Sequence, residues 1–407
     1  MNKVAIIGVG HTKFGVLDNK DLLDLLCEAS LQAIEDSGTA KADFDSVYVG
    51  AMCPGEFNHI TAVASALVDK INLLPAAADH IENGPASGGS TIKAGFQAIA
   101  SGMSDLVLVV GGEKMTHIDI PGYVTSIIAT ITHPQAERPH GVSLPSLAGL
   151  LTRTYLEKYN AKLEWISDIT IKNHKNGALN PNAHFQRTIE SFMDSAIKKG
   201  KGHWNDVHEF LKDDKANPII ADPLRLFHVC PISDGAAALV MCNAAIAKEF
   251  TDAPILISGV GQATDTHIVY EREDVTTFNA LKLASSQAYT MANKTPNDID
   301  VCEAHDAFSI LEAIQSEDLG FFRKGEGAKA AHEGLTQIGG KISINPSGGL
   351  KARGHPIGAT GVAQVVELFW QLRGEAGKRQ VEGAETGITC NFGGFGNNIV
   401  SILVERM

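Results

Sequence analysis

Apolar residues follow two alternating patterns along the chain, and these predict strands separated by amphipathic helices. Val4–Gly10 is a nearly continuous apolar run that ends in GVG, and Leu22–Ser37 then has apolar residues at helical spacing. Short continuous apolar runs are typical of strands buried on both faces. The alternation therefore predicts an α/β protein whose mixed, largely parallel sheets are covered by helices.

The same pattern occurs a second time in the later part of the chain. Ile255–Gly261 again ends in GVG, and a helical pattern over Ala280–Asn293 follows it. Three further elements match between the halves. A strand at Asp45–Gly50 matches Asp300–His305, and a glycine-rich helix start at Ser87–Ser90 matches Gly358–Gly361. A very apolar strand at Asp105–Val110 matches Asn398–Val404. These matches predict a duplicated molecule, and chance similarity between two α/β halves is the alternative.

Residues between the two halves do not follow this pattern. Several histidines and prolines lie within residues 116–145, and helical stretches rich in lysine and asparagine follow. We expect residues 1–115 and 220–250 to form the N-terminal half, residues 251–407 the C-terminal half, and residues 116–219 an insertion. A loop-rich insertion of this length in an enzyme usually covers a substrate site. For residues 116–145, a surface excursion without function is the alternative.

Composition and charge exclude several classes of function. The 407 residues have a net charge of −13 and contain no long basic run, so nucleic acid and anionic membranes are not expected partners. No apolar stretch approaches the ~20 residues of a membrane span. The six cysteines include no CxxC pair, which predicts neither a metal site nor a disulfide framework. We therefore expect a cytoplasmic protein.

Three segments contain the residue types that carry out chemistry. His305 ends a predicted strand, His355 lies in the glycine-dense segment Asn345–Gly361, and Cys390 precedes a second glycine-rich turn. Ligands of α/β proteins bind at the carboxyl ends of strands. Two histidines and a cysteine at such places favour a functional site over isolated structural residues.

These segments resemble the motifs of the thiolase superfamily. The sequence GHPIGATG at Gly354–Gly361 resembles the thiolase GHPxGxTG motif, and HDAF at His305–Phe308 is similar to the HDCF-type motif of the sterol-carrier-protein and archaeal branch. The segment from Pro223 through CPISDGAAA at Cys230–Ala238 resembles the end of the first thiolase half. The resemblance covers the whole chain and implies the thiolase fold, with duplicated halves in five layers, α-β-α-β-α.

One position departs from the family pattern. Thiolases place a nucleophilic cysteine at the start of a buried helix, and the matching residue here is Pro85, within Ile81–Gly89. Proline has neither a thiol nor a backbone N–H, so this position provides no acyl-enzyme and one oxyanion donor fewer. Loss of one such donor typically costs about 10²–10³ in rate. Ser87 is expected to form helix-start hydrogen bonds, with replacement nucleophile as the alternative.

The rest of the resemblance implies a retained site. Cys390 matches the second thiolase cysteine, which acts as acid and base, and His355 and His305 match residues that bind the substrate carbonyls. Gly393 and Gly394 would supply backbone amides to an oxyanion. Coenzyme A is then the expected co-substrate. A non-catalytic relative is the alternative to this interpretation.

The function implied is CoA-dependent thiolysis of a 3-oxoacyl-CoA, or the reverse Claisen condensation, without a covalent acyl-enzyme. An aromatic substrate such as benzoylsuccinyl-CoA, cleaved to benzoyl-CoA and succinyl-CoA, fits a site in which Pro85 replaces a thiol. The alternatives are a retro-aldol lyase of β-hydroxyacyl-CoA side chains and a non-catalytic scaffold subunit. The chemical products distinguish these three functions.

The resemblance also implies partners. Thiolases assemble through the sheet of the first half, so we expect a homodimer, within a heteromer that contains a zinc-ribbon/OB-fold subunit. CoA would enter beneath residues 116–145. Lys172 and Lys175 are candidates for its phosphates, with solvated surface lysines as the alternative.

Overall fold

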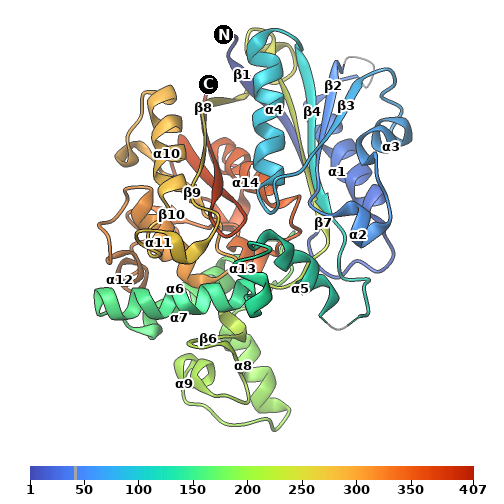
Figure 1. Cartoon of the computed structure of the whole chain (residues 1–407). Coiled ribbons are helices and arrows are strands. Elements are labelled where there is room, and N and C mark those ends of the chain that lie inside the picture. Colours follow the sequence, from blue (N-terminus) through green and yellow to red (C-terminus); the bar gives the residue numbers. More distant parts are fainter. Residues whose placement is uncertain (41–43, 121) are drawn as a thin grey trace.

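Strands from both ends of the chain form one sheet in the computed structural model, which describes residues 1–40, 44–120 and 122–407 (Figure 1). The strand order is β10-β9-β11-β12-β8-β1-β7-β4-β2-β3. The strands are β1 (Val4–His11), β2 (Ser46–Gly50), β3 (Ala77–Ile81), β4 (Leu106–Glu113), β7 (Gly235–Asn243), β8 (Ile255–Thr264), β9 (Val301–Glu303), β10 (Ser343–Ile344), β11 (Thr386–Gly393) and β12 (Asn398–Arg406).

The sheet consists of two equivalent halves joined at one short seam. β3-β2-β4-β7-β1 belongs to the N-terminal half and β10-β9-β11-β12-β8 to the C-terminal half. Only β7 and β12 run against the other strands of their half. β1 and β8 pair antiparallel over three residue pairs, Val4–Ile6 with Ile255–Ile257. The prediction from the sequence that the sheet is mixed and largely parallel is therefore confirmed.

Helices cover both faces of each half and also fill the space between them. Those nearest the strands are α1 (Leu22–Ser37), α3 (Val63–Lys70), α4 (Ser87–Ser101), α10 (Asn279–Ala292), α11 (Ser309–Asp318) and α14 (Thr360–Arg373). Core residues of α4 and α14 pack together in the central layer, α1 and α3 pack on the outer face of the N-terminal half, and α10 and α11 on that of the C-terminal half. This is the expected order α-β-α-β-α.

Successive strand residues point into different layers, as strand geometry requires. In β1, Val4 and Ile6 belong to the central core, whereas Ala5 and Ile7 belong to the outer core with α1. In β12, Val400 faces the central layer and Ile399 faces α10. Both faces of these strands are buried, which explains the continuous apolar runs in the sequence.

The topology confirms the duplication but corrects one of its matches. β1, α1, β2 and α4 take the places that β8, α10, β9 and α14 take in the other half. The strand that corresponds to β4 is β11, because each is the third strand from its edge, and β12 corresponds to β7. The match of Asp105–Val110 with Asn398–Val404 was therefore wrong.

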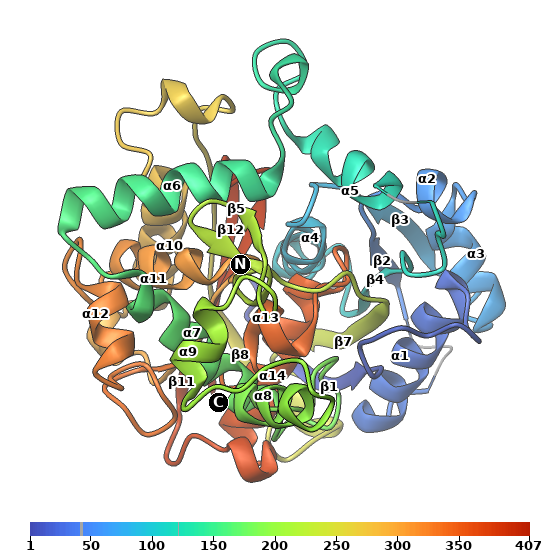
Figure 2. The same ribbon diagram turned by 90° about the horizontal axis from the view of Figure 1, so that it is seen from below.

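The segment between β4 and β7 is mostly helical. It contains α5 (Tyr123–Ile128), α6 (Leu144–Tyr159), α7 (Leu163–Gly177), α8 (Ile189–Lys198), α9 (Val207–Lys212) and the hairpin of β5 (Ile219–Ala221) and β6 (Leu224–Arg225). α8 and α9 project at the bottom of Figure 1, and Figure 2 shows α6 and β5 in front of the sheet. The boundaries at residues 115 and 219 stay a prediction.

The remaining helices are short. They are α2 (Pro54–Asn58), α12 (Gly327–His332) and α13 (Gly349–Arg353). Within the described ranges, no helix combines the length and the apolar character that crossing a bilayer requires.

Candidate functional site

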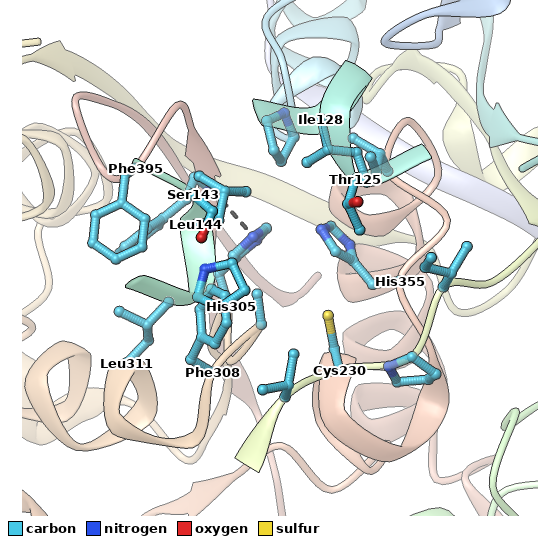
Figure 3. Close-up of a pocket in the computed structure, with 18 of the residues that line it drawn as sticks. Thr125, Ile128, Ser143, Leu144, Cys230, His305, Phe308, Leu311, His355 and Phe395 are labelled. Carbon is cyan, nitrogen blue, oxygen red and sulfur yellow. Dashed lines mark hydrogen bonds between the residues drawn. The ribbon is translucent and has the colours of Figure 1, made fainter. Parts of the chain in front are cut away.

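A largely apolar cavity of about 360 Å³ lies where the two halves and the inserted segment meet. Its walls include residues from all three parts: Pro85 and Met115, then His305, Phe308, His355 and Phe392, and finally Thr125, Ile128, Ser143 and Leu144. Figure 3 shows the imidazole rings of His305 and His355 extending into this space. The inserted segment therefore forms part of the wall, as expected of a covering element.

Pro85 lines the cavity just before α4. Its carbonyl oxygen accepts a hydrogen bond from Asn391 Nδ2 at 3.0 Å, and Asn391 Oδ1 accepts one from the N–H of Gly89 at 2.9 Å. Asn391 on β11 thus ties the C-terminal half to the start of α4. With no N–H and no nucleophilic atom, Pro85 supplies only apolar surface to the site.

Ser87 serves the helix start rather than the cavity. Its hydroxyl donates to the carbonyl of Gly84 at 2.6 Å and accepts from the N–H of Asn83 at 2.9 Å. The side chain is fully buried and is absent from the cavity wall. These bonds agree with the helix-start role and leave the hydroxyl proton engaged with a carbonyl.

His355 presents an unprotonated nitrogen to the cavity. The Thr360 hydroxyl donates its one proton to the carbonyl of Pro356 at 2.9 Å, so it accepts from His355 Nδ1, which lies 2.6 Å away. This assigns the proton to Nδ1 and leaves the lone pair on Nε2. Burial, with a smaller effect of the Arg353 cation, lowers the pKa of His355 to about 3. The ring is therefore neutral, with the Nε2 lone pair directed toward the cavity.

His305 has the opposite tautomer. The backbone N–H of Phe392 and the side-chain Nδ2 of Asn391 both point at His305 Nδ1, at 3.5 and 3.4 Å. Nδ1 is thus an acceptor, and Nε2 carries the proton. Burial, followed by electrostatic effects of His355 and Arg353, holds the pKa of His305 well below its usual range. A neutral ring with its N–H toward the cavity can donate to a carbonyl oxygen.

Packing fixes the relative orientation of the two rings. The His305 and His355 ring centres are 5.1 Å apart and the rings are nearly perpendicular, at 88°. The His305 ring also stacks parallel to the Phe392 ring, with centres 5.4 Å apart. The N–H of His305 and the lone pair of His355 are therefore directed into the same small part of the cavity.

The prediction for Cys390 is wrong in its placement. Cys390 lies on β11 with no exposed surface and belongs to the outer core beneath α10, where it contacts Cys302. It does not line the cavity. Its neighbour Asn391 points the other way and reaches the helix start below Pro85, because adjacent strand residues face opposite sides.

The glycines at the end of β11 differ in position. Gly394 lines the cavity with a φ of +59°, and a Cβ there would meet the side chain of Asn397. Gly393 is the last residue of β11, pairs with Asn398, and does not line the cavity. An oxyanion role for these two amides stays a prediction.

Sequence reasoning missed Cys230 as a site residue. It lines the cavity, and Figure 3 shows its sulfur directed toward the same space as the two imidazole rings. The signal was present, because Cys230 opens the CPISDGAAA motif. It was passed over because that motif was interpreted only as the end of the first half.

The lysine candidates for phosphate binding are corrected in part. Lys172 is not a surface lysine: its Nζ lies 2.6 Å from Glu312 Oε1 and 2.6 Å from the carbonyl of Ile344, with the side chain only 9% exposed. This ion pair occupies the ammonium group, so Lys172 is unsuited to CoA phosphates. Lys175 is exposed. Across the described part of the chain, no group of three or more His, Cys, Asp or Glu side chains is arranged to hold a metal ion.

Comparisons with known proteins agree on one family. The model of the thiolase N-terminal domain matches residues 4–245, and the model described as thiolase C-terminal domain-like matches residues 261–406. An acetyl-CoA acetyltransferase of Methanothermobacter thermautotrophicus is 44% identical over 408 residues, which is 100% of both chains. Human sterol carrier protein 2 is 32% identical over 99% of this chain and 72% of its own length.

A solved structure, that of the Ltp2-ChsH2(DUF35) aldolase, superposes with a TM-score of 0.79. The two sequences are 23% identical, and the match covers 99% of this chain and 98% of the other. This likeness shows a shared fold.

Proposed function

The chain belongs to the thiolase family, and we propose that it cleaves or forms the carbon–carbon bond of a 3-oxoacyl-CoA by direct reaction with the CoA thiol. As a thiolase-family acyltransferase, it transfers an acyl group between carbon and sulfur. The observation that carries the proposal is Pro85 in the cavity wall, beside two neutral histidines. With no nucleophile at that position, the acyl group passes directly to CoA.

The two histidines have complementary roles in this reaction. His355 Nε2 accepts the proton of the CoA thiol, which then attacks the β-carbonyl. His305 Nε2–H donates to an oxygen on which negative charge develops, either the tetrahedral alkoxide or the enolate. Holding both reactants in one cavity supplies the proximity that a covalent intermediate would otherwise provide.

Aromatic residues of the cavity support a bulky or aryl acyl group. Phe278 and Phe392 pack edge to face with centres 5.0 Å apart, and Phe308 and Phe395 lie 6.4 Å apart on the same wall. Such rings favour edge or offset contact with another ring. Benzoylsuccinyl-CoA, which would give benzoyl-CoA and succinyl-CoA, is the substrate we propose to test first.

We also propose an assembly of two copies of the chain with a zinc-ribbon/OB-fold subunit. β3 is the edge strand of its half, and its pattern is mostly exposed or half-exposed. An open edge can pair with another strand. The fold shared with the Ltp2-ChsH2(DUF35) aldolase is compatible with a second type of subunit.

The test is a product assay on the purified chain, with and without the partner subunit. Aryl and alkyl 3-oxoacyl-CoAs are mixed with CoA, and products and intact protein are followed by mass spectrometry. We expect two acyl-CoA thioesters, no mass added to the protein, and losses of about 10²–10³ in rate for His305→Ala and His355→Ala.

Other outcomes would assign a different function. A covalent acyl-protein adduct would contradict the direct route. Cleavage of a β-hydroxyacyl-CoA without CoA, giving a carbonyl compound and one thioester, would identify a retro-aldol lyase. No product with any substrate, with the partner present, would identify a scaffold subunit.

A further inference from the structure

Among the described residues that line the cavity, Cys230 is the one that has a thiol, and the proposed reaction gives this thiol no role. Cys230 is fixed relative to His305 through the backbone: its N–H donates to the carbonyl of Ala307 at 2.9 Å, and Val229 forms an antiparallel bridge with Phe308. The side chain is half-buried and lines the cavity. The thiol is therefore positioned by the same loop that positions His305.

The Nε2 atoms of two buried histidines face the same space and have no hydrogen-bond partner in the described protein. His305 is 3% exposed and His355 is 9% exposed, and their side-chain hydrogen bonds within the described chain all involve Nδ1. Buried polar atoms are normally hydrogen-bonded. Both Nε2 atoms therefore point to a polar ligand, such as a carbonyl or enolate oxygen, which would lie next to Cys230 (Figure 3).

A buried cation supports the Cys230 segment from behind. Lys351, on α13, is 2% exposed and donates from Nζ to the carbonyl of Val229 at 2.8 Å. Burial lowers the pKa of Lys351 to about 8, against the opposing effects of Cys230 and Asp306. Burial likewise raises the pKa of the Cys230 thiol to about 12, while the Lys351 charge acts to lower it. The group at rest is a thiol, and a transient thiolate would have a cation nearby.

We propose that Cys230 is the catalytic acid and base at the α-carbon of the substrate, and that Lys351 is a positioning residue that stabilises its thiolate. The proposal rests on the proposed function. Attack of CoA sulfur on the β-carbon forms a C–S bond, with the thiol proton passing to His355 Nε2. Collapse of the alkoxide breaks the C–C bond and releases the second thioester as its enolate.

Cys230 then completes the reaction. Its S–H bond breaks as the proton moves to the α-carbon and forms a C–H bond, which leaves a thiolate. Protonated His355 returns its proton to that thiolate, so both groups regain their resting states and no oxidant or reductant is needed. In the condensation direction, the Cys230 thiolate removes the α-proton.

The experiment measures this proton transfer apart from bond cleavage. The chain with its partner subunit is incubated in D₂O with acetyl-CoA or succinyl-CoA, and deuterium uptake at the α-carbon is followed by mass spectrometry. We expect uptake with the wild type and a decrease of about 100-fold or more in Cys230→Ser and Cys230→Ala, since general acid–base groups typically contribute 10²–10⁴-fold. Thermal unfolding of both variants confirms that they are folded.

Two further variants separate chemistry from structure. Cys53→Ala removes a half-buried thiol outside the cavity wall and should exchange like the wild type. Lys351→Met should slow exchange and move its pH profile to higher pH, because the thiolate loses its nearby cation. A purely structural role for Lys351 would leave that profile unmoved.

The outcomes distinguish this proposal from the proposed function. Wild-type exchange rates in Cys230→Ser would overturn the role of Cys230 and leave thiolysis intact. Retro-aldol products with slow exchange in Cys230→Ser would overturn thiolysis and retain Cys230 as the acid at the enolate. An acyl group on Cys230, or no exchange by the wild type, would overturn both.

Discussion

Single hydrogen bonds decide what each histidine offers to a substrate. Thr360 accepts the Nδ1 proton of His355, whereas the Phe392 amide donates toward Nδ1 of His305. Identical side chains therefore present a lone pair in one case and an N–H in the other. A base and a hydrogen-bond donor result from the backbone and hydroxyl groups behind the rings, without any charged partner.

Replacing Pro85 by cysteine should restore covalent chemistry. The variant regains a thiol and a backbone N–H at a helix start, where the helix dipole favours a thiolate, and it faces the same cavity as His355. We expect Pro85→Cys to gain the mass of one acyl group on incubation with acetyl-CoA, measured on the intact protein. Pro85→Ala, which regains only the N–H, is the matched control and should remain unmodified. An unmodified Pro85→Cys would show that the loss of covalent chemistry has another cause.

At this scale the sequence located the histidines but not the thiol. His305 and His355 lie next to strand ends and glycine-rich turns, and such features can be identified from the sequence alone. The face of a strand on which Cys390 lies depends on register, because a shift of one residue exchanges the two faces. Cys230 reaches the cavity through the Val229–Phe308 bridge, a contact between residues far apart in the chain.

At the scale of elements, the repeated GVG sequences have a physical reason. A Cβ on Gly10 would lie 2.0 Å from the carbonyl oxygen of Ala29 in α1, and one on Gly261 would lie 1.9 Å from that of Ala284 in α10. The outer helix of each half thus rests directly on the backbone of its strand. Only glycine allows so close an approach.

Gly261→Ala should therefore destabilise the fold strongly. The new methyl group meets backbone of α10, which cannot move aside as a side chain can, so we expect a loss of about 3 kcal/mol or more in the free energy of unfolding. Urea denaturation followed by circular dichroism measures it.

Gly55→Ala provides the comparison, since nothing lies within 4 Å of a Cβ at that helical position. It should be neutral or slightly stabilising. Equal stability of the two variants would contradict the close-contact explanation.

Periodicity predicted the existence of the elements but did not predict every pairing. The GVG strands, the helices after them and the two glycine-rich helix starts were matched correctly. β4, β11 and β12 are all fully or mostly buried, so hydrophobic pattern alone does not tell which strand lies third from an edge. That order emerges only when the strands assemble.

For the whole molecule, Glu113 joins the halves near the site. Its Oε2 accepts from the N–H groups of Met52 and Gly358, and the latter belongs to the loop that carries His355. Burial raises the pKa of Glu113 from its ordinary 4.5 to about 7, although these amides oppose the shift. Between pH 4.5 and pH 7, Glu113 is therefore protonated in the folded protein and ionised in the unfolded chain.

This contribution to stability is fully present below pH 4.5 and is lost as pH rises through 7. Relative to the wild type, Glu113→Gln should gain about 3 kcal/mol between pH 4.5 and pH 8, measured by urea denaturation across that range. Glu190→Gln, at an exposed position, should follow the wild type at every pH. If the free energies of unfolding of Glu113→Gln and the wild type differed by the same amount at every pH, the raised pKa of Glu113 would be contradicted.

The close contact of the two glycine-rich helix starts has one more consequence. A Cβ on Gly88 would lie 2.8 Å from the carbonyl oxygen of Gly358, so the start of α4 lies directly against the segment that leads into α14. Pro85 lies in the segment that leads into α4 and His355 in the segment that leads into α14, so each half supplies one of these two cavity residues. The candidate site therefore lies between two copies of one structural unit, and the difference between the copies provides an inert wall on one side and a base on the other.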